Sequence, residues 1–190
     1  MRYCIKPRLF KFTWACFLAL LLILPVAAKA EGIEIRSAEL EPVEETLVLN
    51  AELEISLSPA IEDVLNKGVP LNFIVDFELK KPRWYWLDET IAAVQQHIRL
   101  NYHALTRQYQ LSLNGQYQNF SSLSEARREL GRLHGWTVVE KGRVKKHTAY
   151  VAGLRMKLDM TQLPKPLQVN ALASKEWNLD SEWHRWNIAP

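Results

Sequence analysis

The chain has 190 residues, with 24 Lys and Arg against 21 Asp and Glu and a formal net charge of +3. Five of these bases and no acid lie in residues 1–30, so the rest of the chain has a net charge of −2. The basic character of the whole chain therefore belongs largely to residues 1–30 and is no argument for nucleic-acid binding, and we expect no nucleic-acid partner. Both cysteines, Cys4 and Cys16, also lie in residues 1–30, so the remainder can form neither a disulfide nor a thiolate metal site.

Residues 1–30 show the three parts of a secretory signal peptide in their usual order. Four bases lie within the first eleven positions, and residues 14–24 are continuously apolar. Ala28 and Ala30 then supply the two small residues that a signal peptidase reads. The alternative is an uncleaved membrane anchor, but a helix needs about 20 apolar residues to span a bilayer. We therefore predict that a signal peptide, residues 1–30, exports a single β-rich domain, residues 31–190, to the periplasm.

Three stretches of the exported part alternate between apolar and polar side chains, which is typical of strands with one buried face. A helix would spread the same side chains around its circumference, so we predict three strands. The inward-facing sets are Leu47, Leu49, Ala51, Leu53, Ile55 and Leu57; Leu71, Phe73, Val75, Phe77 and Leu79; and Tyr150, Ala152, Leu154, Met156, Leu158 and Met160.

Two segments predict short helices instead. The first begins at Pro59, carries acids in its first turn and stops at Gly68. The second spans residues 122–134, where Ser122 and Glu125 form a capping box that is followed by an apolar stripe.

The remaining segments are less regular. Residues 90–104 fit either period, and we favour a strand from Gln95 onward. Asn114-Gly115 predicts a two-residue hairpin turn, and Pro164 and Pro166 predict a break or a sheet edge before the apolar residues that follow. Seven or more strands, two short helices and hairpin links together predict a mostly β fold, either an antiparallel β-sandwich or a strongly curved sheet.

Two regions of the chain resemble a known family. The first holds the aromatic segment at residues 82–86 and the stretch at residues 102–109, and the second is the tail at residues 163–172 and 177–186. These segments are similar to DUF4390, a family of small exported proteins of Gram-negative bacteria, and the resemblance covers essentially the whole exported part. It implies no activity, cofactor or catalytic residue. The family's genes often lie beside a membrane sensor histidine kinase of the nitrogen-regulation type, which implies an envelope-sensing or regulatory accessory role.

The exported part shows no sequence pattern typical of catalysis or of cofactor binding. Its five histidines form no His-x-x-x-His pair, and neither a Gly-x-Ser-x-Gly segment nor a Gly-rich phosphate loop is present. The serines at positions 121–124 are explained by helix capping. We therefore expect neither an enzyme nor a cofactor or metal, although a Ser and a His brought together by folding would leave no such pattern.

Tryptophan is the unusual feature of the composition, because six of the seven lie beyond residue 30. One interpretation is that these rings fill the core. The other is a surface that stacks on sugar rings or receives a partner segment, because Trp and Arg are enriched at binding hot spots. Under the second interpretation, the candidate binding residues are Arg83, Trp84, Trp86, Trp177, Trp183, Arg185 and Trp186.

A basic loop over residues 141–147 also has two interpretations. Its four bases suit either a solvated hairpin tip or a contact with anionic head groups, a glycan or an acidic partner.

Together these features predict a non-enzymatic binding or regulatory accessory protein of the periplasm. Its partner would be a protein of the envelope, such as the sensor kinase that the family resemblance implies. The alternative is a protein that binds a glycan or the cell envelope through exposed Trp faces, and the basic loop adds the membrane surface as a third class of partner.

If residues 1–30 are removed during export, the mature protein begins at Glu31 and lacks both cysteines. Mass spectrometry of protein from the periplasmic fraction should therefore give the mass of residues 31–190, and maleimide should label no thiol. Intact Met1 on protein from the cytosol would contradict this prediction.

Overall fold

The computed structural model of the chain describes residues 32–44, 46–85, 87–145 and 147–189. The described residues form one compact unit. The predicted signal peptide lies outside the described residues. Within the described part of the chain, no helix has both the length and the apolar character that crossing a membrane requires.

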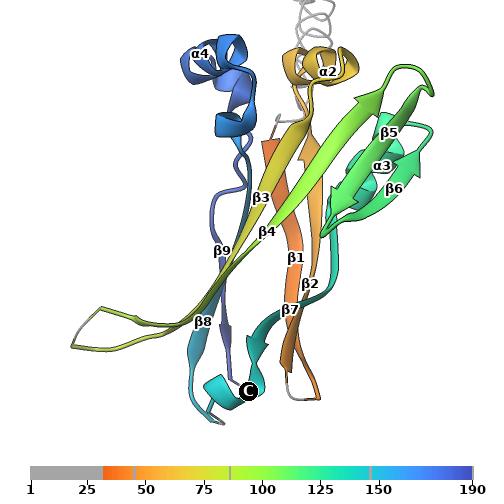
Figure 1. Cartoon of the computed structure of the whole chain (residues 1–190). Helices are drawn as coiled ribbons and strands as arrows, with labels where there is room; N and C mark the ends of the chain where they lie inside the picture. The colour runs from red at the N-terminus through yellow and green to blue at the C-terminus, as the bar shows by residue number, and fades with distance from the viewer. Residues whose placement is uncertain (1–31, 45, 86, 146, 190) are drawn as a thin grey trace, which may run out of the picture. The chain divides into compact units, whose positions relative to one another are not determined.

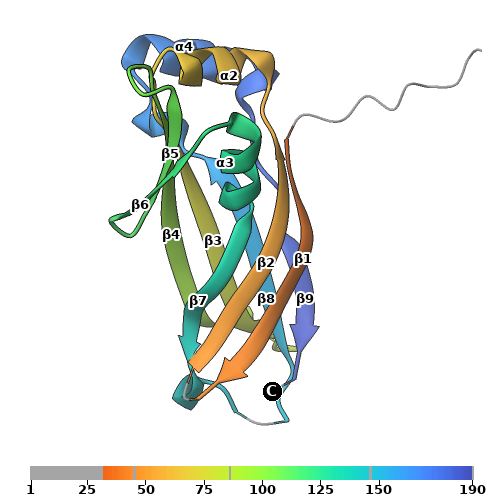
Figure 2. The same ribbon diagram turned by 90° about the vertical axis from the view of Figure 1, so that its right-hand side faces the viewer.

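The described residues form nine strands in two antiparallel sheets that lie face to face (Figure 1, Figure 2). The smaller sheet has the order β1-β2-β7, with β1 at Gly32–Val43, β2 at Thr46–Ser56 and β7 at Arg132–Glu140. The larger sheet has the order β6-β5-β4-β3-β8-β9. Its strands are β3 (Leu71–Lys81), β4 (Glu89–His103), β5 (Gln108–Leu113), β6 (Gln116–Phe120), β8 (Tyr150–Leu158) and β9 (His184–Ile188). The mostly β, sandwich-like fold that the sequence predicts is therefore confirmed.

Three α-helices and three short 3-10 helices occur within the described ranges. They are α2 (Pro59–Asn66), α3 (Leu123–Leu130), α4 (Lys165–Ala173), η1 (Lys141–Arg143), η2 (Met160–Gln162) and η3 (Lys175–Trp177).

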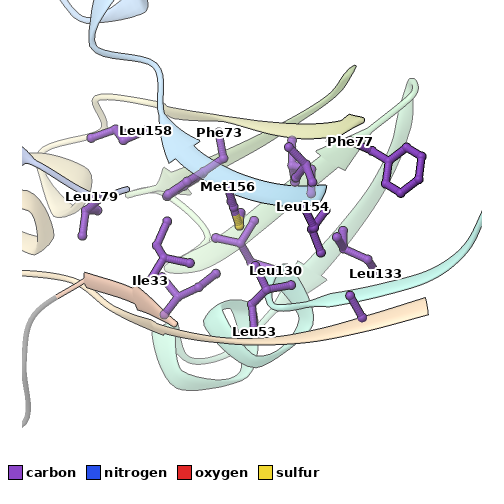
Figure 3. Close-up of a cluster of buried hydrophobic side chains, with 14 of the residues drawn as sticks. Ile33, Leu53, Phe73, Phe77, Leu130, Leu133, Leu154, Met156, Leu158 and Leu179 are labelled. Atoms are coloured by element: carbon purple, nitrogen blue, oxygen red, sulfur yellow. The ribbon is translucent and has the colours of Figure 1, made fainter. Parts of the chain in front are cut away.

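The apolar faces of the predicted strands meet between the two sheets. Phe73, Val75 and Phe77 of β3 are at most 1% exposed. Figure 3 shows Leu154 and Met156 of the larger sheet among the side chains that fill the space above the smaller sheet. Every inward-facing residue of the three predicted strands is buried except Met160, which lies beyond the end of β8 in η2 and is half-buried.

The first predicted helix is confirmed as α2. Ser58 caps it, because its hydroxyl accepts a hydrogen bond from the backbone N–H of Ile61. The same hydroxyl donates to the carbonyl of Glu176 at 3.0 Å, so a fully buried serine joins α2 to η3 near the other end of the chain.

The second predicted helix begins at the capping box as expected, but it ends at Leu130 rather than at residue 134. The chain enters β7 directly afterwards, and Leu133, which fits the helical stripe, is buried from that strand instead. The helix ends early because of a contact with a distant part of the chain. The carbonyl of Gly131 accepts a hydrogen bond from the N–H of Leu53 at 2.7 Å, which pulls the backbone onto β2 and stops the helix.

Two further predictions need correction. β4 begins at Glu89, earlier than the predicted start at Gln95, because its first half pairs along β3. The segment after Pro164 is a helix, α4, and not a sheet edge, because a proline in the first turn of a helix sacrifices no hydrogen bond.

The hairpin turn is confirmed, since Asn114 and Gly115 have φ values of 49° and 81° and connect β5 to β6.

Replacing Gly131 by alanine should destabilise the fold strongly. The new Cβ would lie 2.1 Å from the carbonyl oxygen of Leu53, so the backbone of α3 or β2 would have to move. We expect a loss of about 2–3 kcal/mol in the free energy of unfolding, measured by urea denaturation. Gly142→Ala is the matched control, because its Cβ would meet nothing within 4 Å, and its effect should stay within about 0.5 kcal/mol. Equal effects of the two substitutions would contradict this account of the helix end.

Candidate binding surfaces

The connection between β3 and β4 forms an arm at one end of the larger sheet. The two strands stay paired as far as Lys81 and Glu89, whereas β5 pairs with β4 only from Ile98 to His103. Figure 1 shows the arm leaning out from the body on the side away from β1 and β2. Residues 82–88, at its end, are called the arm tip below.

The arm tip exposes large apolar side chains to water. Trp84 is 94% exposed, Tyr85 66% and Leu87 82%. They are three of the seven large exposed apolar side chains in the described part of the chain. The rings of Trp84 and Tyr85 contact each other edge to face, with centroids 5.1 Å apart. Large apolar side chains that lie together in water are typical of a contact site. Trp86, another candidate from the sequence, lies outside the described residues.

An ion pair closes the base of the arm tip. The guanidinium of Arg83 donates to the carboxylate of Glu89, and this hydrogen bond is the main reason why the pKa of Glu89 lies below its usual range. Arg83 also donates its backbone N–H to Asp88. The candidate residue Arg83 therefore holds the two ends of the tip together, and it leaves the contact itself to the aromatic rings.

The basic loop between β7 and β8 lies near the base of the arm. Arg143 and the β4 residues Ala92 and Ala93 line the same hollow of about 340 Å³. The charge of Lys145 contributes to lowering the pKa of Glu89 in the arm. Lys145 also donates its backbone N–H to the hydroxyl of Tyr150 at 2.9 Å, which fixes the loop to the start of β8.

The candidate residues of the tail do not join the arm tip. Trp177 is 5% exposed and belongs to the core, so its ring is not available to a partner. Trp186 is half-buried and lies opposite Ala152 in the pairing of β9 with β8. Trp136, which no site prediction used, packs against Phe77 with ring centroids 6.4 Å apart. The core interpretation therefore describes these three rings.

Trp183 and Arg185 lie on the outer face of the larger sheet. The ring of Trp183 passes over Gly153, where an added Cβ would come within 3.2 Å of it. The guanidinium carbons of Arg155 and Arg185 lie 4.7 and 5.5 Å from the centre of this indole ring. The indole is thus engaged by cations from β8 and β9.

Beside Trp183 lies a polar cluster that sequence reasoning missed. Asp76, 6% exposed, accepts hydrogen bonds from Arg155 at 2.8 Å and Gln95 at 2.6 Å, and Lys157 lies 3.4 Å away. Burial alone would raise the pKa of Asp76, but the hydrogen bond from Arg155 and the charge of Lys157 outweigh it and hold the pKa below its ordinary value of 3.8. The cluster borders a hollow of about 470 Å³.

The alternation of apolar and polar residues along the strands already places the charged members of this cluster on the polar faces. Asp76 belongs to the polar set of β3, and Arg155 and Lys157 belong to the polar set of β8. Only the pairing of β3 with β8, which brings Asp76 opposite Arg155, makes them neighbours. Since the carboxylate is matched by its cations, the cluster primarily joins three strands on their outer face. Among the described residues, no group of three His, Cys, Asp or Glu side chains could hold a metal ion.

Comparison with known proteins assigns the chain to no characterised activity. The model of the family described as domain of unknown function (DUF4390) matches residues 30–187. No curated protein and no solved structure gives a significant match.

Replacing Asp76 by asparagine should remove charge-assisted hydrogen bonds and lower the free energy of unfolding by about 2 kcal/mol at neutral pH. Because the pKa of Asp76 is lowered in the folded state, its ionised form stabilises the protein above pH 3.8 and this contribution is lost as the pH falls through the folded-state value. The difference between wild type and Asp76→Asn should therefore shrink below about pH 3.8. Urea denaturation across this range measures it.

Asp63→Asn is the control for this experiment. Asp63 forms an exposed ion pair with Lys67 on α2, and such pairs contribute about 0.5 kcal/mol or less. A difference for Asp76→Asn that is no larger than that of the control would contradict the structural role of the cluster.

Proposed function

Because this chain belongs to the DUF4390 family, whose description assigns no function, we propose from its geometry that it is a non-enzymatic binding protein of the bacterial envelope. Residues 1–30 would export it to the periplasm, where it would act as a regulatory accessory to a protein of the membrane. The family resemblance implies that a gene for a membrane sensor histidine kinase often lies nearby, which favours the sensor domain of such a kinase as this partner.

The observation that carries the proposal is the exposure of Trp84, Tyr85 and Leu87 together at the end of a paired hairpin. Exposed Trp and Tyr side chains offer large contact areas with few rotatable bonds, which is why aromatic residues dominate binding hot spots. The ion pair between Arg83 and Glu89 limits the freedom of the tip before it binds. A preorganised aromatic tip supports binding, whereas the polar cluster at Asp76 is already satisfied by its own cations.

A glycan is the second candidate ligand, since an exposed indole can stack on a sugar ring. Trp84 is the ring that favours it, because its 94% exposure leaves the indole open. Trp183 gives this candidate less support, because guanidinium groups from Arg155 and Arg185 already lie against the ring.

A photo-crosslinking amino acid placed at Tyr85 should capture an envelope protein in living cells. The matched control is the same amino acid at Tyr117, because both tyrosines are 66% exposed and Tyr117 lies in β6 at the far side of the sheet. We expect a defined protein adduct from position 85 and none from position 117, identified by mass spectrometry of the periplasmic and membrane fractions.

Three outcomes separate the candidates. An adduct that contains the sensor domain of a membrane kinase supports the regulatory role. Retention of the purified protein on peptidoglycan, lost in Trp84→Ala, would favour the glycan candidate instead. Identical adduct patterns from positions 85 and 117, together with no retention on peptidoglycan, would remove the arm tip from the proposal.

A further inference from the structure

The arm tip also has the chemistry of a membrane-docking element. We propose that Trp84, Tyr85 and Leu87 enter the interfacial layer of an anionic phospholipid membrane, while the basic residues behind them contact the phosphate groups. This inference rests on the proposed function in one respect, namely that the arm tip is the contact element. It adds the surface on which the protein meets its partner.

The first argument is the kind of side chain at the tip. Trp and Tyr are the residues that concentrate at membrane–water interfaces, because their rings are apolar and their polar atoms reach water. Leu87 adds an aliphatic side chain that is 82% exposed. The connection that carries them projects from the body as the end of a hairpin (Figure 1), which suits insertion into a soft layer.

The second argument is the charge behind the tip. Residues 80–89 and 140–147 together hold seven Lys and Arg against three Asp and Glu, whereas residues 31–190 as a whole have a net charge of −2. The two segments are neighbours, because Arg143 and Ala93 line the same hollow, and the charge of Lys145 contributes to the lowered pKa of Glu89. Cations therefore collect at this end of a weakly acidic domain, as an anionic surface requires.

The order of the groups along the arm matches the order of layers in a bilayer. The apolar side chains are outermost, and Lys81 follows them toward the body, beside Lys80, which forms an ion pair with Glu78. The β1–β2 hairpin, which carries Glu41 in β1 and Glu44 in its turn, lies on the other side of the body from the arm in Figure 1. A surface that approaches from the arm side thus meets aromatic rings first and bases next.

The test is binding of the protein, purified from the periplasm, to vesicles of phosphatidylethanolamine and phosphatidylglycerol, with phosphatidylcholine vesicles as the neutral comparison. We expect flotation with the anionic vesicles that weakens as salt is raised. The combined variant Trp84→Ala, Tyr85→Ala and Leu87→Ser should bind at least about tenfold more weakly. Each of Lys81→Gln and Lys145→Gln should weaken binding by about fivefold.

Leu105→Ser is the matched control. Leu105 is 102% exposed and lies in the turn between β4 and β5, so its loss removes apolar surface without touching the arm. It should bind vesicles like wild type. A second readout is specific to insertion: vesicles should shift the tryptophan emission of wild type to the blue and protect it from acrylamide, and Trp84→Phe should lose most of this change.

The results separate this inference from the proposed function. Absence of vesicle binding by wild type, alongside a protein adduct from position 85, would overturn membrane docking and leave the envelope partner standing. Equal binding by the tip variant and Leu105→Ser would overturn it as well. Salt-sensitive vesicle binding that depends on the tip, without any protein adduct, would support the membrane contact and remove the protein partner.

Discussion

The burial of one face of β3 is the constraint on which the rest of the structure depends. This strand lies between β4 and β8 in the larger sheet, and Phe73, Val75 and Phe77 are at most 1% exposed against the core. Each buried phenylalanine contributes about 1.5–3 kcal/mol. Because side chains alternate along a strand, burying these residues places Asp76 on the outer face beside Arg155. A slip of one residue would put the carboxylate in the core and the rings in water. The same strand continues as a paired hairpin into the arm, so one packing interaction sets both the outer ion pairs and the direction of the arm.

Most of this architecture could be predicted from local sequence. The strands at Leu47–Leu57 and Leu71–Leu79 show the period of two because each has one buried and one outer face. Helix α2 was predictable because Ser58 and Pro59 specify its start locally. The end of α3 was not, because Gly131 stops the helix through a hydrogen bond to a residue 78 positions earlier in the chain. Helix α4 was not predicted, because Pro164 and Pro166 suggested only a break or a sheet edge, although a proline also fits the first turn of a helix.

The candidate site shows the same division between local and distant information. Composition identified the tryptophans as candidates, but only the folded structure separates the exposed rings from the buried ones. Trp84 is 94% exposed to water, whereas Trp177 is 5% exposed and belongs to the core. Local sequence points the wrong way here, because Trp84 lies in an aromatic segment and is exposed, whereas Trp177 lies between Glu176 and Asn178 and is buried. The cluster at Asp76 was missed for the complementary reason. Its members are ordinary outward-facing charges in their own strands, and it is strand order that makes them a unit. Chemistry that depends on pairing between distant strands cannot be read from one strand at a time.

Two hairpins of the larger sheet give the strongest physical argument that the arm tip is a contact element. The turn between β5 and β6 is Asn114-Gly115, a short polar connection whose positive φ values suit a tight hairpin. The connection between β3 and β4 serves the same topological purpose, yet it is longer and places Trp84, Tyr85 and Leu87 in water. Exposed apolar surface costs about 25 cal/mol per Å², and these side chains lie beyond the last paired residues, Lys81 and Glu89, where no core covers them. Folding alone requires no such tip, since Asn114-Gly115 connects β5 to β6 without exposed apolar side chains, so the apolar character of the arm tip is explained by what it contacts outside the domain.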